Sequence, residues 1–123
     1  EGFIAAKRAI RCRYAEALGD LPGITLFPGT GQEGSGCWFS GIVVEDDALP
    51  RAAELSVRLR AMGVEARTFW KPAHLQAAFA WVPRADLPVT ERLWSRVLTL
   101  PCSTNLPGAE ADCVVTAVRR ILA

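Results

Sequence analysis

Five side chains that could bind an anion or a planar ring lie within ten residues of one another. They belong to the stretch GVEARTFWKPAHLQ. The five are Arg67, Trp70, Lys71, His74 and Gln76. Arginine, lysine and protonated histidine pair with phosphate and carboxylate oxygens, and the face of a tryptophan stacks on other rings. The stretch predicts a contact surface for an anionic ligand, or else an exposed connection whose charges only face water.

Catalytic groups are harder to find. Lys7 and Lys71 are the only two lysines, and so the only side-chain amines that could form a Schiff base. Lys7 belongs to an amphipathic helix, and for Lys71, beside Trp70 and Pro72, a contact to an anionic ligand is the favoured interpretation. We therefore predict no catalytic residue in this chain.

The cysteines and acids do not supply an alternative chemistry. The four cysteines form no CxxC pair and are accompanied by one histidine, which predicts no metal site; they are Cys12, Cys37, Cys102 and Cys113. No local signature pairs a cysteine with His74 as a nucleophile. The adjacent acids at 45–47 are typical of a solvated turn. Nothing indicates secretion, so we expect reduced thiols and a cytoplasmic protein.

Composition limits the class of protein. The chain has 123 residues, half of them hydrophobic and 22% charged, which suits one globular domain. Its formal net charge of +1 gives no electrostatic case for nucleic acid or a membrane surface. The chain begins Glu1-Gly2-Phe3 and enters a helix almost at once, so we expect it to be cut from a longer protein.

The elements that would position the five side chains can be read from hydrophobic period and from Pro and Gly. Gly63 is placed to end a helix, a short strand follows, and Pro72 breaks it. Helices are predicted at 3–18, 50–62, 87–94 and 108–122, and strands at 24–27, 37–44, 64–69 and 97–100. This pattern predicts an α+β fold. The sheet would be small, of three or four strands, with helices packed mainly on one side.

Three further expectations concern particular segments. We place the strand at 64–69 beside the strand at 37–44, with their relative direction open. The basic residues Lys7, Arg8 and Arg11 share one arc of the first helix, which is more typical of a solvated face than of a phosphate site. The glycine-rich segment 28–36 lacks the Lys-Ser/Thr and following helix of a phosphate-binding loop, so a hairpin or connecting loop is predicted.

Four blocks of the sequence resemble the DegT/DnrJ/EryC1/StrS family of pyridoxal-phosphate-dependent sugar aminotransferases. In chain order they are RAIRCRYAEAL, GCWFSGIVVED, GVEARTFWKPAHLQAAF and VTERLWSRVLTLPCSTNL. The blocks follow the family's order and cover almost the whole chain. The Trp-Lys-Pro-x-His-Leu-Gln core is most similar to members that aminate UDP-linked 4-keto-6-deoxy-N-acetylhexosamines.

The resemblance implies that residues 1–123 are the C-terminal small domain of such an enzyme, as in fold-type I aminotransferases. The intact enzyme would use pyridoxal 5'-phosphate to transfer an amino group from glutamate to a nucleotide-linked 4-keto-6-deoxy sugar. It would be a homodimer, and the cofactor lysine would lie in a large N-terminal domain that is absent here. By position, Arg67, Trp70, Lys71, His74 and Gln76 would bind the sugar nucleotide.

The isolated chain would then be inactive and would not hold the cofactor tightly. Thr68 and Ala77 stand where the family often has Pro, Ala73 where it has Leu or Met, and Gly41 where many members have a larger residue. A looser loop is therefore expected. The alternatives from other classes are a stand-alone α+β ligand-binding module and a protein-interaction domain. The sequence names neither the sugar nor the amino donor.

Overall fold

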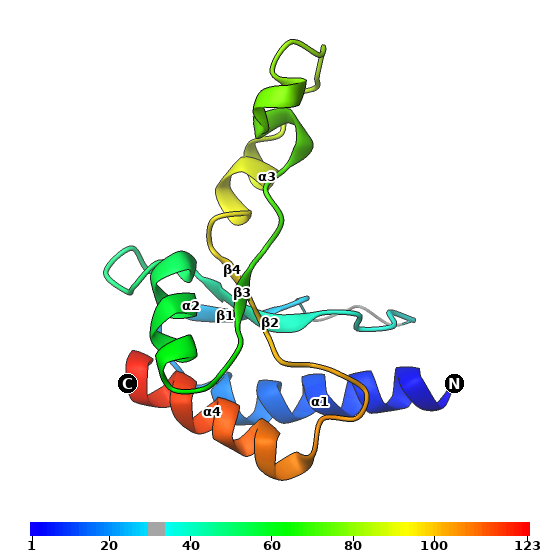
Figure 1. Ribbon diagram of the computed structural model, residues 1–123, viewed down its shortest axis with the longest axis vertical. Helices are drawn as coiled ribbons and strands as arrows, with labels where there is room; N and C mark the ends of the chain where they lie inside the picture. The colour runs from blue at the N-terminus through cyan, green and yellow to red at the C-terminus, as the bar shows by residue number, and fades with distance from the viewer. Residues whose placement is uncertain (30–33) are drawn as a thin grey trace.

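A four-stranded antiparallel sheet lies at the centre of the molecule (Figure 1). The computed structural model describes residues 1–29 and 34–123. The strands are β1 (Ile24–Phe27), β2 (Ser40–Val44), β3 (Arg67–Thr68) and β4 (Val97–Leu100). Their order across the sheet is β1-β2-β4-β3, and each neighbouring pair is antiparallel.

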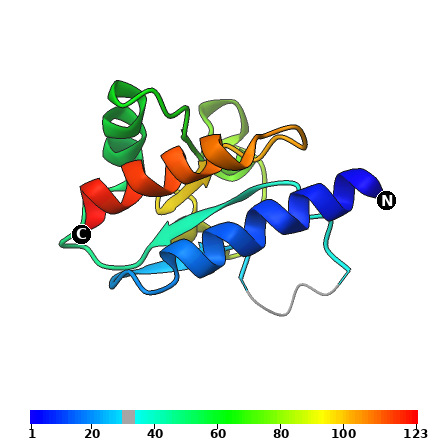
Figure 2. The same ribbon diagram turned by 90° about the horizontal axis from the view of Figure 1, so that it is seen from below.

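Three long helices cover one face of this sheet (Figures 1 and 2). They are α1 (Gly2–Leu18), α2 (Ala52–Ala61) and α4 (Gly108–Leu122). Side chains alternate between the two faces of a strand, so Ile42 and Leu98, which are paired in register, both point into the helical layer. Both are fully buried, together with Tyr14, Leu18 and Leu55 at 1% exposure or less. The core therefore lies between the sheet and the three helices.

The opposite face of the sheet carries the other set of side chains, and none of the long helices in the described part of the chain covers it. The register places Phe27 opposite Gly41, and Val43 opposite Val97, on this open face. The chain between β3 and β4 leaves from this side of the molecule (Figure 1). It contains the short 3-10 turns η1 (Ala73–Leu75) and η2 (Ala77–Phe79) and the helix α3 (Pro88–Leu93).

The predicted fold class is confirmed, since the structure is α+β with its long helices on one face. The prediction that the strand at 64–69 lies beside the strand at 37–44 is wrong, because β4 lies between β2 and β3. The physical reason is that β3 and β4 form an antiparallel pair around the protruding chain. All four residues of β4 are buried, whereas both residues of β3 are exposed, so β4 takes the inner place.

Most predicted elements form close to the expected positions. The last helix spans Gly108–Leu122 and the last strand Val97–Leu100, as predicted. Gly63 follows α2 with a φ of 81°, the left-handed conformation that glycine adopts without strain. The strand predicted at 64–69 is shorter, with only Arg67–Thr68 paired. Residues 30–33 of the glycine-rich segment predicted to be a hairpin or connecting loop lie outside the described residues. No helix of the described chain has the length and hydropathy to cross a membrane.

Candidate functional site

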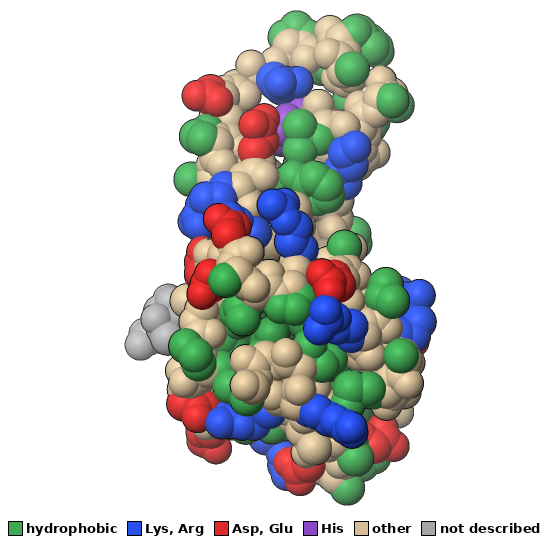
Figure 3. All heavy atoms as spheres, turned by 90° about the vertical axis from the view of Figure 1, so that its left-hand side faces the viewer, with side chains coloured by type: hydrophobic (Ala, Val, Ile, Leu, Met, Phe, Trp, Pro, Cys, Tyr) green, Lys and Arg blue, Asp and Glu red, His purple; other side chains and the backbone are tan. Residues whose placement is uncertain are grey.

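The chain from 69 to 96, which we call the arm, rises from the open face of the sheet and stands clear of the body (Figures 1 and 3). Neither of its 3-10 turns nor α3 contains a buried residue. Every residue from 77 to 92 is exposed. The arm also carries four of the five side chains predicted to bind a ligand. Its base is therefore the place where a site could be built against the body.

Five aromatic rings pack together where the arm meets the sheet. This aromatic cluster consists of Phe27, Trp38, Phe39, Phe69 and Trp70. The ring centroids of Phe27 and Phe69 are 5.1 Å apart, and those of Trp38 and Trp70 are 5.8 Å apart. Trp38 remains 70% exposed and Trp70 59% exposed, so both leave a ring face available to a ligand.

A hollow of about 420 Å³, which we call the arm hollow, lies beside this cluster. Its wall is mainly apolar and contains one cation. The lining residues are Phe27, Phe69, Trp70, Lys71, Pro72, Ala73, Thr90, Leu93, Trp94 and Val97. They come from β1, from β4 and from the two legs of the arm, which are the segments at 69–76 and 88–96 that connect it to the sheet. Rings and an ammonium group in one concave wall suit a ligand that has both a planar or apolar part and negative charge.

A second hollow of about 300 Å³, the edge hollow, lies at the β3 side of the sheet. The residues that line it include Arg67, Glu65, Trp38 and Lys7. The Arg67 guanidinium binds Glu65 Oε1 at 2.6 Å, and this hydrogen bond holds the pKa of Glu65 below its ordinary value. Lys7 Nζ donates to the carbonyl oxygens of Trp38 at 3.0 Å and Cys102 at 2.5 Å. The edge hollow is therefore more polar than the arm hollow, and its cations already have partners.

The side chains of His74 and Gln76 form contacts within the arm. His74 Nε2 lies 3.1 Å from Glu91 Oε1 of α3, and only 11% of the imidazole side chain is exposed. Gln76 Nε2 donates to the carbonyl oxygen of Lys71 at 2.8 Å. The first contact joins the two legs of the arm, and the second shapes the turn that presents Lys71.

The structure thus divides the five predicted residues among three places. Trp70 and Lys71 line the arm hollow, Arg67 lines the edge hollow, and His74 and Gln76 brace the arm. The aromatic cluster lies between the two hollows, since Trp70 belongs to one and Trp38, its ring neighbour, to the other. The five are close together in the fold, but they do not share a single pocket.

The basic arc of α1 is solvated only in part, since Arg8 is exposed while Lys7 and Arg11 are half-buried. It was predicted to be a solvated face, but its cations bind backbone carbonyl oxygens of neighbouring segments. Arg8 Nε donates to Ser35 at 3.1 Å and Arg11 Nη2 to Pro28 at 2.7 Å, in addition to the two bonds of Lys7. Carbonyl groups outside regular structure need donors, and the long basic side chains reach them. Helical spacing could not reveal this, because the partners are distant in sequence.

Three aromatic residues that line the hollows were not singled out from the sequence. They are Phe27 and Trp94 in the arm hollow and Trp38 in the edge hollow. Trp38 was assigned to a strand and Trp94 to a short helix, with no role in binding. No local pattern brings them together with Trp70. Trp38 packs against Trp70, and Phe27 and Trp94 line the arm hollow with Trp70, because the sheet brings β1, β2, β4 and β3 together. Among the described residues, no group of three or more histidine, cysteine and acidic side chains is arranged to hold a metal ion.

Comparison with known proteins identifies the family of this chain. The sequence model of the DegT/DnrJ/EryC1/StrS aminotransferase family matches residues 1–119, and the chain belongs to this family. It is 33% identical to the dTDP-3-amino-3,4,6-trideoxy-alpha-D-glucose transaminase of Micromonospora megalomicea subsp. nigra, over 99% of this chain and 33% of that protein. It is 29% identical to the putative pyridoxal phosphate-dependent aminotransferase EpsN of Bacillus subtilis, over 91% of this chain and 29% of that one.

Solved structures agree. The aminotransferase TlmJ from Streptoalloteichus hindustanus superimposes with a TM-score of 0.82 at 26% identity, over 98% of this chain and 32% of that structure. A DegT DnrJ EryC1 StrS aminotransferase from Brucella abortus superimposes with a TM-score of 0.79 at 30% identity, over 98% of this chain and 31% of that structure. The chain therefore spans about a third of the length of the relatives it matches.

Proposed function

We propose that this chain is the C-terminal small domain of a longer, pyridoxal-phosphate-dependent sugar aminotransferase, and that its arm hollow forms one wall of the sugar-nucleotide site. The observation that carries this proposal is the arm hollow, in which Trp70 and Lys71 face a common space of about 420 Å³ within a chain of this family. The amino donor we propose is glutamate, and the acceptor is a nucleotide-linked 4-keto-6-deoxy sugar.

The five predicted residues would have different roles in binding the sugar nucleotide. Lys71 would pair with the diphosphate, whose negative charge a compact ammonium group attracts from within an apolar wall. Trp70, supported by the aromatic cluster, would stack on a ring of the ligand. Arg67, which lines the edge hollow, would release Glu65 and donate to a phosphate oxygen of the ligand instead. His74 and Gln76 would hold the arm in the shape that presents Lys71.

The residues of this chain do not fit the cofactor by themselves. Pyridoxal phosphate requires a lysine for its Schiff base and an acid beside its ring nitrogen. The Lys7 ammonium donates to two carbonyl oxygens, and the described residues that line the arm hollow, where Lys71 lies, include no carboxylate. Within this proposal the cofactor and the catalytic lysine belong to the rest of the enzyme, and the isolated chain neither holds the cofactor tightly nor transaminates.

The proposal is tested by titrating the chain with UDP-linked and dTDP-linked sugars while recording amide chemical shifts. Binding should perturb the amides of residues 69–73 and 90–97. Lys71→Ala should weaken it by roughly tenfold, because a charge-assisted contact contributes on the order of 1.5 kcal/mol. Trp70→Ala should weaken it by roughly fivefold, since stacking on a ring contributes about 1 kcal/mol.

Arg58→Ala is the matched control, because Arg58 lies on α2 in an exposed pair with Glu54 and lines neither hollow. In the intact enzyme, the same Lys71 and Trp70 changes should raise KM for the sugar nucleotide and leave the reaction with the amino donor unaltered. Equal damage to both half-reactions would count against the arm hollow as a substrate wall.

A protein-interaction domain is the second candidate, and the exposed apolar side chains of the arm are the observation in its favour. Trp81 is 82% exposed, Val89 62% and Phe79 45%. Exposed apolar side chains grouped on one protrusion commonly mark an interface. Sedimentation of the chain at increasing concentration distinguishes the two. Association that Trp81→Ser abolishes, with no sugar-nucleotide binding at any concentration, would favour the interaction domain.

A further inference from the structure

The arm is fixed only where it joins the body. Its turns and α3 have no buried residue, so no packed core along its length sets its direction. Two legs connect it to the sheet, one leaving β3 at Phe69 and one entering β4 from Arg96. The contacts at these two points therefore determine how the arm stands over the open face.

The first leg is held by rings and one backbone bond. The amide of Phe69 donates to the carbonyl oxygen of Val97 at 3.1 Å, and its ring packs against Phe27 and Phe39 with centroid distances of 5.1 and 6.4 Å. This leg carries Trp70 and Lys71 directly after Phe69. The aromatic contacts are not directional enough to set the angle of the whole arm.

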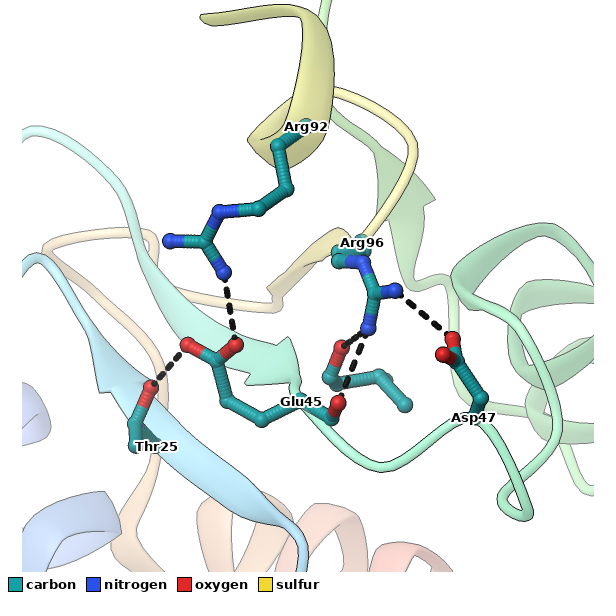
Figure 4. A network of polar contacts seen from close by, with 6 residues as sticks. Thr25, Glu45, Asp47, Arg92 and Arg96 are labelled. Atoms are coloured by element: carbon teal, nitrogen blue, oxygen red, sulfur yellow. Dashed lines mark hydrogen bonds and ion pairs between the residues drawn. The ribbon is translucent and has the colours of Figure 1, made fainter. Parts of the chain in front are cut away.

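The second leg is held by charge, and Arg96 is its main residue (Figure 4). Its Nη1 donates to the carbonyl oxygens of Val44 at 3.2 Å and Glu45 at 2.9 Å, and its Nη2 to Asp47 Oδ1 at 2.6 Å. Its own carbonyl oxygen accepts the amide of Val44 at 3.0 Å. One residue of the arm is thus bonded through side chain and backbone to the end of β2. The rigid guanidinium fork makes this a directional attachment.

A second arginine repeats the attachment from α3. Arg92 Nη1 lies 3.0 Å from Glu45 Oε2, and Glu45 Oε1 in turn accepts a 3.4 Å hydrogen bond from Thr25 Oγ1 of β1 (Figure 4). We call Thr25, Glu45, Asp47, Arg92 and Arg96 the base clamp. The Arg96 side chain is 25% exposed and that of Arg92 54%, so Arg96 is the better shielded of the two.

The geometry points to Arg96 as a positioning residue: it fixes the direction in which the arm leaves the sheet, and with it the width of the arm hollow. Both legs line that hollow, Trp70 and Lys71 from one and Leu93 and Trp94 from the other. Arg96 holds the second leg against the end of β2. Without it, Leu93 and Trp94 lose their fixed distance from Trp70. That the ligand in the hollow is a sugar nucleotide rests on the proposed function.

Amide hydrogen exchange in the intact enzyme tests the positioning role without reference to a ligand. Arg96→Ala should accelerate exchange in residues 70–93 by about tenfold, because the second leg loses the hydrogen bonds of a charged group to the end of β2. Exchange in α1 and α4 should be unchanged. Arg96→Lys keeps the charge without the fork and should give an intermediate rate. Asp47→Ala removes one partner of Arg96 and should give a smaller acceleration, so the test survives if Arg96→Ala fails to fold.

Kinetics of the same variants tests the consequence for binding. Arg96→Ala should raise KM for the sugar nucleotide by about tenfold, a loss of roughly 1.4 kcal/mol, and leave the half-reaction with the amino donor within twofold of the parent. Arg58→Ala should alter neither the KM for the sugar nucleotide nor the half-reaction with the amino donor. Unchanged exchange in the arm of Arg96→Ala would overturn the inference. Faster exchange with an unaltered KM would support the clamp and overturn the proposed substrate wall instead.

Discussion

Gly41 shows at the scale of one residue how closely β2 and β4 approach each other. A Cβ atom at Gly41 would lie 2.0 Å from the carbonyl oxygen of Leu98 and 2.9 Å from the Cα of Thr99. Both atoms belong to the backbone of β4, the neighbouring strand, which cannot move aside without breaking the ladder. The close approach of β2 and β4 therefore requires glycine, which the sequence marked only as smaller than in many family members.

Replacing Gly41 by alanine should destabilise the domain by about 1–3 kcal/mol, the usual range for forcing an extra group into a packed site. Urea unfolding followed by circular dichroism measures this change. Gly29→Ala is the control, because a Cβ there meets no atom within 4 Å. If the two variants were equally stable, the close approach of the strands would not be a constraint on the sequence.

At the scale of elements, charged side chains join helices that are distant in the sequence. Arg119 in the last turn of α4 donates to the carbonyl oxygen of Ala17 at 2.6 Å and forms a fork with Asp20, at 2.6 and 2.8 Å to the two carboxylate oxygens. The hydrogen bond from Arg119 lowers the pKa of Asp20 below its ordinary value of 3.8. A cation in this turn complements the helix dipole, and Arg119 also connects α4 to the end of α1.

The lowered pKa of Asp20 predicts a sign for the pH dependence of stability. A carboxyl group whose pKa is depressed by folding contributes stability above its unfolded value, and this contribution disappears as the pH falls through the folded value. Asp20→Asn should therefore unfold at a lower temperature than the parent at neutral pH, and the difference should shrink below about pH 3.8. Thermal unfolding at several pH values measures it. Asp86→Asn, a change on the exposed arm, is the control and should show no such convergence.

At the scale of the whole molecule, the chain divides into a packed body and an arm without a core. Residues 77–92 are exposed throughout, whereas the buried side chains gather between the sheet and α1, α2 and α4. Stability is therefore unequal, and local opening should be concentrated in the arm. This difference matters for the proposed function, because the arm carries Trp70 and Lys71.

Limited trypsin digestion should cut the chain after Arg84 before it cuts the body. Arg84 lies in the exposed part of the arm and its contact to the carbonyl oxygen of His74 is long, at 3.4 Å. The Lys71–Pro72 bond, being followed by proline, should resist. Mass spectrometry of the first products identifies the site. Early cleavage after Arg13 within α1 would show that the body is not the more stable part.

Hydrophobic period and the positions of Pro and Gly determined most of the elements, because these signals are local. The helix Gly108–Leu122 and the strand Val97–Leu100 follow from their own residues, and so does the turn at Gly63. The family resemblance was likewise carried by the sequence alone. The cluster of charged and aromatic side chains at 63–76 was likewise visible in the sequence, and its role in binding stays a prediction.

Only the tertiary structure decided how those pieces meet. The place of β4 between β2 and β3, the packing of Trp38 against Trp70, and the attachment of Arg96 to the end of β2 all join residues far apart in the chain. Such contacts depend on which strands pair and which face each side chain takes. That choice minimises the free energy of the whole fold, so no short stretch of sequence contains it.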